Sequence, residues 1–231
     1  MDIKANGSRI WELDFLRGTA LILMIYFHII FDMAVFFNYS VSYEGNINYY
    51  IGKISAILFI LIAGICCSLS GNNIKRGLKV TGAALFVTLA SYIYNPGFII
   101  LFGILHFLGF CILLSTATNK LGKYSLLISG TIIIITGFFI QFINVNHNYL
   151  FIFGIINRSF VSQDFYPLIP WFGVFLYGMA FGKELYSQNR SLFKSSPRYR
   201  MVSTAGRHTL PIYLIHQPVI LLIFKLAALI W

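Results

Sequence analysis

Charged residues are scarce in this chain. They make up 10% of its 231 residues, whereas a soluble domain carries about 25%. So few charges cannot cover a surface that faces water, which excludes a soluble globule and suits a protein surrounded by lipid. Acidic residues are scarcest, with seven Asp and Glu against 17 Lys and Arg.

Cysteine is also rare. The three cysteines, Cys66, Cys67 and Cys111, all fall inside apolar runs. An odd number within such runs argues against a disulfide framework, and their spacing matches no zinc site. No Walker-type loop or dinucleotide fingerprint occurs. We therefore expect buried thiols and no metal cofactor.

Long apolar runs fill most of the sequence. Hydrophobic residues reach 58% and the mean hydropathy is +0.78. A helix needs about 20 apolar residues to cross the hydrocarbon core of a bilayer. The sequence therefore predicts an all-α integral membrane protein, one transmembrane domain over residues 1–231 with about seven spans. The predicted spans are 15–37, 49–70, 77–94, 98–117, 122–143, 166–186 and 209–230.

The basic residues predict the orientation of these spans. Cytoplasmic segments of membrane proteins are enriched in Lys and Arg. With the N-terminus in the cytoplasm and the C-terminus outside, all basic residues except Lys53, Arg158 and Lys225 lie on the cytoplasmic side. These are Lys4, Arg9, Arg17, Lys75, Arg76, Lys79, Lys120, Lys123, Lys183, Arg190, Lys194, Arg198, Arg200 and Arg207. This pattern explains the net charge of +10 without nucleic acid as a partner.

Two segments between the predicted spans carry further expectations. Residues 144–165 include an apolar stretch too short to span, so they form an outer loop, an interfacial helix or a re-entrant piece. Residues 187–206 are expected to be a basic cytoplasmic loop that contacts anionic lipid. The glycines of three spans predict close helix packing, namely Gly64 beside Ser68, Gly103 with Gly109, and Gly173 with Gly178 and Gly182.

Four ionisable residues lie along one face of the first predicted helix. At about 100° per residue, Asp14, Arg17, His28 and Asp32 fall within about 60° of one another. His28 and Asp32 are one turn apart, close enough for the carboxylate to orient the imidazole. Ionisable groups inside a membrane are costly, so each one indicates a functional site by default.

Two other predicted spans carry polar groups at membrane depth. His106 lies in GILHFLG, and His216 with Gln217 lies in IYLIHQP. Pro218 follows at once and should kink or loosen the last helix. Three histidines on three helices could line one polar cavity. The alternative for each is a hydrogen-bonded packing residue.

The sequence resembles a known family over nearly its whole length. The segments that carry the resemblance are RIWELDFLRGTALILMIYFHIIFD, FILIAGICCSLS, FGILHFLG, DFYPLIPWFG and GRHTLPIYLIHQPVI. They are similar to the DUF1624 group, bacterial and archaeal proteins that resemble the catalytic domain of heparan-alpha-glucosaminide N-acetyltransferase. Asp14, Arg17 and Gly18 match the D-x-x-R-G that opens the first helix there.

The resemblance implies a multi-pass acyltransferase of the prokaryotic plasma membrane. Such an enzyme moves an acetyl group from cytoplasmic acetyl-CoA to an amino sugar or cell-envelope glycan. The family's lysosomal branch has its catalytic histidine in the loop after the first helix. Residues 38–48 have no histidine, so His28, oriented by Asp32, becomes the candidate base. His106, His216 and Gln217 complete the candidate catalytic set, with His106 or Gln217 as donor to the oxyanion.

Basic residues near the cytoplasmic face are the candidate binding site for the nucleotide of acyl-CoA. Cations bind phosphates through charge-assisted hydrogen bonds. The candidates are Arg17, Lys75, Arg76, Lys79 and Arg207. Direct transfer and an acyl-histidine intermediate both stay open at this point, as do the acceptor, the acyl chain length and a homo-oligomer. The rival classes are a proton-coupled small-molecule transporter and a non-catalytic membrane scaffold.

Overall fold

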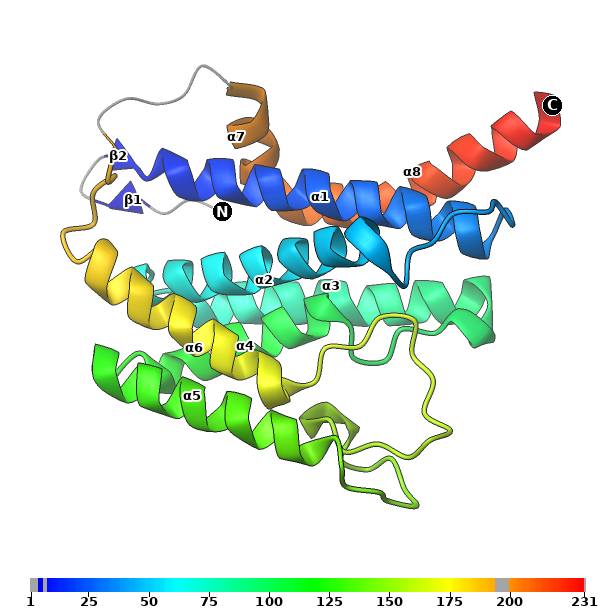
Figure 1. The fold of residues 1–231 in the computed structure, drawn as a ribbon. Helices are drawn as coiled ribbons and strands as arrows, with labels where there is room; N and C mark the ends of the chain where they lie inside the picture. The colour runs from blue at the N-terminus through cyan, green and yellow to red at the C-terminus, as the bar shows by residue number, and fades with distance from the viewer. Residues whose placement is uncertain (1–3, 6–7, 194–199, 231) are drawn as a thin grey trace. The chain divides into compact units, whose positions relative to one another are not determined.

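The computed structural model describes residues 4–5, 8–193 and 200–230. In this part of the chain nearly all regular structure is helical (Figure 1). A pair of two-residue strands, β1 (Lys4–Ala5) and β2 (Ser8–Arg9), precedes the first helix. The helices are α1 (Trp11–Val35), α2 (Asn46–Leu69), α3 (Asn73–Tyr94), α4 (Ile104–Thr118), α5 (Lys123–Ile140), α6 (Leu168–Leu185), α7 (Arg200–Arg207) and α8 (Thr209–Ile230), with the 3₁₀ turns η1 (Pro96–Phe98) and η2 (Phe151–Phe153).

The chain is a helical membrane protein. Among the described residues, α1, α2, α3, α5 and α8 are long and apolar enough to cross a membrane. The ends of these five helices lie within four residues of the predicted span ends. Helix α4 has 15 residues and α6 has 18 with a non-helical residue, Ile169, near its start. Seven spans and their orientation stay predictions.

The described residues divide into two compact units. The first comprises residues 1–59 and 191–231, and the second comprises residues 60–190. Helix α2 runs from the first unit into the second. In the first unit, α1 packs against α7 and α8 (Figure 1), and Ser55 of α2 donates a hydrogen bond of 2.8 Å to the carbonyl of Ala20. The single transmembrane domain stays a prediction.

Glycines bring the helices of the second unit into close contact, as the sequence predicts. A Cβ on Gly178 of α6 would overlap the Leu61 carbonyl of α2, and one on Gly64 would overlap the Phe175 carbonyl. Gly109 packs in the same way against Thr81 of α3. Such contacts let backbones approach where no hydrophobic effect drives helices together. Cys67 and Cys111 are fully buried in the apolar core of this unit.

The fourth helix begins later than predicted, because residues 99–103 are not helical. Pro96 and Gly97 end α3 in a 3₁₀ turn, and the chain then pairs in parallel with the segment before α6, at Phe102 and Phe165. The Asp164 carboxylate accepts from the Ile104 backbone N–H at 2.8 Å, where α4 starts. Gly103 therefore lies against Asp164 and not in a helix interface. Hydrophobicity alone does not distinguish this extended segment from a helix.

The structure distinguishes the two inter-span segments from each other. Residues 144–165 contain one 3₁₀ turn, η2, and no α-helix, so the interfacial-helix alternative is wrong. In the segment 187–206, residues 200–206 belong to helix α7, which packs on α1. A loop was the wrong prediction there, because Ser203 and Gly206 are buried and Gly206 lies directly against the backbone of α1. Lys194, Arg198 and Trp231, which the orientation prediction includes, lie outside the described residues.

Candidate functional site

Polar side chains from α1 and α8 meet within the first unit. The rings of His28 and His216 have their centroids 4.8 Å apart. One helical turn further along α1, Asp32 accepts a hydrogen bond of 2.7 Å from the Gln217 side-chain amide. Asp32 is fully buried and His216 is 8% exposed. The structure therefore brings together four of the five predicted catalytic residues, and we call them the α1–α8 cluster.

Each member of the α1–α8 cluster keeps one buried polar atom without a hydrogen-bond partner among the described residues. These atoms are His28 Nδ1, Asp32 Oδ2, His216 Nε2 and Gln217 Oε1. Folded proteins satisfy most buried polar atoms, because an unpaired one costs about 1–3 kcal/mol. Four in one place mark a site that is complete only with a polar ligand or with water.

The backbone of α8 sets the protonation of His216. Its Nδ1 lies within hydrogen-bond distance of the Tyr213 carbonyl oxygen. A carbonyl oxygen only accepts, so Nδ1 must carry the hydrogen. The neutral ring then has its lone pair on Nε2, which is the buried atom without a partner. His216 is thus oriented as a base or as an acceptor.

The predicted pairing of His28 with Asp32 is wrong. Asp32 Oδ1 bonds Gln217 of α8, while Asp32 Oδ2 and His28 Nδ1 have no partner among the described residues. Helical spacing places His28 and Asp32 on one face but does not determine their rotamers. Packing of α8 against that face supplies a different partner for each, the amide of Gln217 for Asp32 and the ring of His216 for His28.

An ion-pair network lies at the other end of α1. Arg17 donates to Asp14 at 2.8 Å, and both side chains are buried. The second oxygen of Asp14 is 3.6 Å from the guanidinium of Arg207, which is half exposed. The Asp14 carboxylate therefore contacts two guanidinium groups. Arg17 and Arg207, two of the predicted cofactor-binding residues, are therefore neighbours.

Glycines explain how α7 reaches this network. A Cβ on Gly18 would overlap the Val202 carbonyl of α7, and a Cβ on Gly206 would overlap the Asp14 carbonyl of α1. The backbones of α1 and α7 are thus in contact. The D-x-x-R-G motif consequently has a structural reading, in which Asp14 and Arg17 form the ion pair and Gly18 admits α7.

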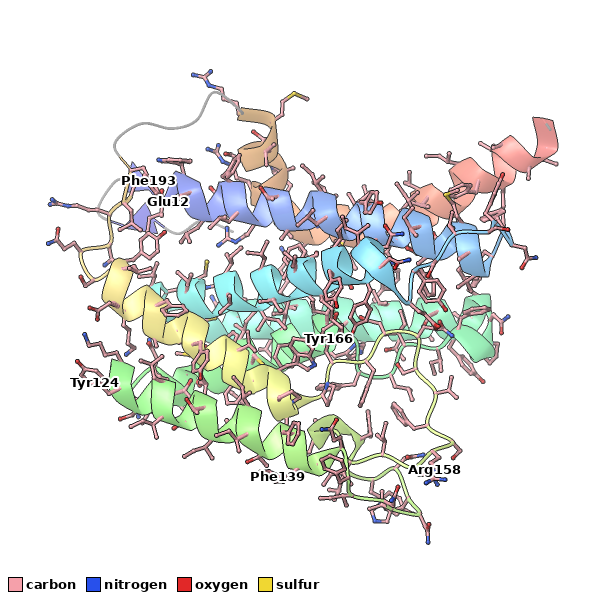
Figure 2. All side chains as sticks on the ribbon, viewed as in Figure 1. Glu12, Tyr124, Phe139, Arg158, Tyr166 and Phe193 are labelled. Atoms are coloured by element: carbon pink, nitrogen blue, oxygen red, sulfur yellow. The ribbon has the colours of Figure 1, made fainter. Side chains whose placement is uncertain are left out.

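Glu12 is a site residue that the sequence reasoning missed. Its carboxylate, 5% exposed, accepts from the Leu192 N–H and from the Ser191 hydroxyl, both at 2.6 Å. Figure 2 labels Glu12 and Phe193 close together at this end of α1, and Trp11 Nε1 donates to the Phe193 carbonyl at 3.4 Å. Glu12 holds the chain where it returns to the first unit. The sequence could have indicated Glu12, because an acidic residue at the edge of a predicted membrane span is rare.

The fifth predicted catalytic residue, His106, belongs to the second unit. Its Nε2 is 2.9 Å from the Thr88 hydroxyl oxygen, and that hydroxyl donates to the Ile100 carbonyl at 2.6 Å. Its Nδ1 is buried without a partner among the described residues. The structure does not show His106 in a cavity with the other two histidines. The shared polar cavity predicted from the sequence is therefore untested.

The other predicted cofactor-binding residues lie on α3. Lys75 and Lys79 are exposed, one turn apart. Arg76 is half-buried and donates to Asn73 Oδ1 at 3.2 Å. Asn73 in turn donates to the Cys67 carbonyl at 2.9 Å. The two lysines are therefore accessible to an anion, whereas Arg76 also has a structural contact.

Comparison with models of protein families shows which family the chain belongs to. The model of the heparan-alpha-glucosaminide N-acetyltransferase catalytic domain matches residues 9–218. The chain belongs to this family. The match begins just before the Glu12–Arg17 segment and ends just after His216 and Gln217, so it includes the whole α1–α8 cluster. No curated protein and no solved structure matches the chain.

Proposed function

We propose that this family member is an acetyltransferase that moves an acetyl group from cytoplasmic acetyl-CoA to the amine of an amino sugar or cell-envelope glycan. Family membership supports the reaction class. The observation that carries the proposal to specific residues is the α1–α8 cluster, with its oriented His216 and its unpaired Asp32 oxygen. We also propose that the chain crosses the membrane seven times, with its N-terminus in the cytoplasm and its C-terminus outside.

Acyl transfer requires a base for the attacking nitrogen. His216 Nε2 has the free lone pair, so we assign the base to His216 and place His28 beside it as a ring contact. Asp32 Oδ2 and Gln217 Oε1 are both acceptors. Together they suit the N–H groups of an amine. His216 Nε2 takes the proton that the amine loses as its nitrogen bonds to the thioester carbonyl carbon, and the C–S bond then breaks so that CoA leaves as its thiol with that proton. Gln217 has a second N–H, which can donate to the carbonyl oxygen under attack.

The basic residues fit the anionic end of acyl-CoA. Arg207 is half exposed beside Asp14, and Lys75 and Lys79 are exposed on α3. Bound acetyl-CoA supplies the activated acetyl group. Arg17, Lys75, Arg76, Lys79 and Arg207 would hold its phosphates by charge-assisted hydrogen bonds.

Purified protein in lipid vesicles tests the proposal with radiolabelled acetyl-CoA and a panel of amino sugars. We expect label in the acceptor for the wild type and for His208→Ala, which removes an exposed histidine eight residues before His216. His216→Ala should reduce transfer about 10²–10⁴-fold, the usual contribution of a general base. If His216→Ala transferred acetyl groups as fast as the wild type, His216 would not be the base.

A proton-coupled transporter is the second candidate. The observation in its favour is that α4 and α6 both begin from non-helical backbone bridged at Phe102 and Phe165. Discontinuous helices often form substrate sites in transporters. Flux of an amino sugar across the vesicle membrane without acetylation would support the transporter and reject the enzyme.

A further inference from the structure

The extended segment before α4 is tied to α3 through one residue. The Ile100 carbonyl accepts from the Thr88 hydroxyl at 2.6 Å, and the Ile100 N–H donates to the Ser91 hydroxyl at 3.1 Å. Both backbone groups of Ile100 are thereby satisfied inside the second unit. This accounts for non-helical backbone in an apolar environment, where unpaired groups are costly.

The same hydroxyl sets the tautomer of His106. Thr88 has one hydroxyl hydrogen and gives it to Ile100, so its oxygen can only accept from His106. His106 Nε2 must then carry the hydrogen, and the lone pair of the neutral ring lies on Nδ1. That atom is buried without a partner among the described residues. Neutral His106 is therefore an acceptor, and the predicted role as a donor to the oxyanion does not fit.

The surroundings of His106 are apolar. The ring is 9% exposed, the Phe102 ring lies 6.1 Å from it, and Phe107 next in sequence is fully buried. A single acceptor beside aromatic rings suits a slender ligand with an isolated N–H. A sugar, with a hydroxyl on most of its carbons, would leave many donors unpaired there. The pantetheine arm of CoA has two amide N–H groups separated by methylene and methyl groups.

We propose that Thr88 is a positioning residue that locks His106 in the Nε2–H form, so that His106 Nδ1 accepts a hydrogen bond from a pantetheine amide. This inference rests on the proposed use of acetyl-CoA. It adds a contact in the second unit, separate from the α1–α8 cluster. It also gives Thr88 a role that neither its position in α3 nor its residue type suggests.

The first test is a binding cycle with CoA and two analogues, each with one pantetheine amide replaced by an ester, which removes the N–H and keeps the shape. Isothermal titration of the wild type should show about tenfold weaker binding for one analogue, as expected for one hydrogen bond of about 1.4 kcal/mol. In His106→Phe that analogue and CoA should bind equally. The inference would be overturned if that analogue bound less tightly than CoA by the same factor in the wild type and in His106→Phe.

Variants of Thr88 separate positioning from packing. Thr88→Val should weaken CoA binding a few-fold and reduce the preference for CoA over the ester analogue, because His106 then loses its fixed tautomer. Thr88→Ser keeps the hydroxyl and should restore both. Thr81→Val is the matched control, since Thr81 lies two turns earlier on α3 against Gly109. A preference in Thr88→Val as large as in the wild type would contradict the proposed lock.

A spectroscopic measurement needs neither activity nor binding. Nitrogen NMR of ¹⁵N-histidine protein distinguishes the two tautomers, and His106→Gln assigns the signal. We expect protonated Nε2 and a lone pair on Nδ1 in wild type and Thr88→Ser, and a mixture in Thr88→Val. Protonated Nδ1 in the wild type would overturn the inference. If acetyl transfer occurs and the binding cycle fails, only this inference falls, and if CoA does not bind, the proposed function falls with it.

Discussion

The two units hold their histidines in opposite settings. In the first, the rings of His28 on α1 and His216 on α8 are in contact. The hydrogen-bonded side chains of Asp32 and Gln217 lie next to them. In the second, His106 is alone, with one hydroxyl partner and aromatic neighbours. A cluster with several unpaired acceptors and a charge can move protons, whereas one fixed lone pair can only recognise a donor. This difference is the basis on which we propose proton transfer for His216 and a hydrogen bond to the ligand for His106.

The largest expected effect separates these two roles in kinetics. His216→Ala should lower kcat for acetyl transfer about 10²–10⁴-fold with little change in the KM for acetyl-CoA. His106→Ala should raise that KM about tenfold and leave kcat nearly unchanged. Steady-state assays at varied acetyl-CoA measure both. The contrast between the units is lost if His106→Ala lowers kcat as strongly as His216→Ala.

A smaller effect concerns the stability of the α1–α8 cluster. Gln217→Leu leaves both oxygens of Asp32 without a partner among the described residues, which should lower the free energy of unfolding by about 1–3 kcal/mol. The double variant Asp32→Leu with Gln217→Leu removes the buried charge and should recover part of the loss. Thermal unfolding in detergent measures this. Additive losses in the double variant would show that the two side chains do not interact.

The contact of α7 with α1 offers a third comparison. Gly18→Ala places a methyl group against the Val202 carbonyl and should cost about 1–3 kcal/mol of stability. Gly82→Ala of α3, which meets nothing within 4 Å, is the control. It should be neutral or stabilising by up to about 1 kcal/mol, since Ala has the higher helix propensity. Unfolding midpoints of the two variants that do not differ would refute close packing at Gly18.

The smallest effect falls on the exposed lysines of α3. Removing both in Lys75→Ala with Lys79→Ala should weaken CoA binding only a few-fold, since exposed pairs with a phosphate contribute about 1 kcal/mol or less each. The loss should shrink at high salt, because salt screens exposed charges. Titration at two salt concentrations measures both. A loss that does not depend on salt would place the lysines outside the phosphate site.

Much of the fold follows from the sequence because it depends on apolar length. Runs of hydrophobic residues predict α1, α2, α3, α5 and α8 closely. The start of α4 is different, since residues 99–103 are as apolar as a helix. Their extended form depends on distant partners, Thr88, Ser91 and Asp164. Helix α7 also depends on tertiary packing, through Gly18 and Gly206.

In the candidate site, too, the sequence predicts which residues take part but not the contacts that they make. The rarity of intramembrane charge singles out His28, Asp32 and His216 from sequence alone. Which atoms meet is decided between helices far apart in sequence. Helical spacing paired His28 with Asp32, whereas Gln217 of α8 is the actual partner of Asp32. The tautomer of His216 depends on a backbone carbonyl, which no residue pattern reveals.

The most direct test compares the two histidines of the α1–α8 cluster in one assay. Wild type, His28→Ala and His216→Ala are purified in lipid vesicles and given radiolabelled acetyl-CoA with an amino-sugar acceptor. The wild type should acetylate the acceptor, His28→Ala should retain measurable activity, and His216→Ala should fall to background, because only His216 has a backbone-fixed lone pair. Full activity in His216→Ala, or loss confined to His28→Ala, would contradict the assignment of the base.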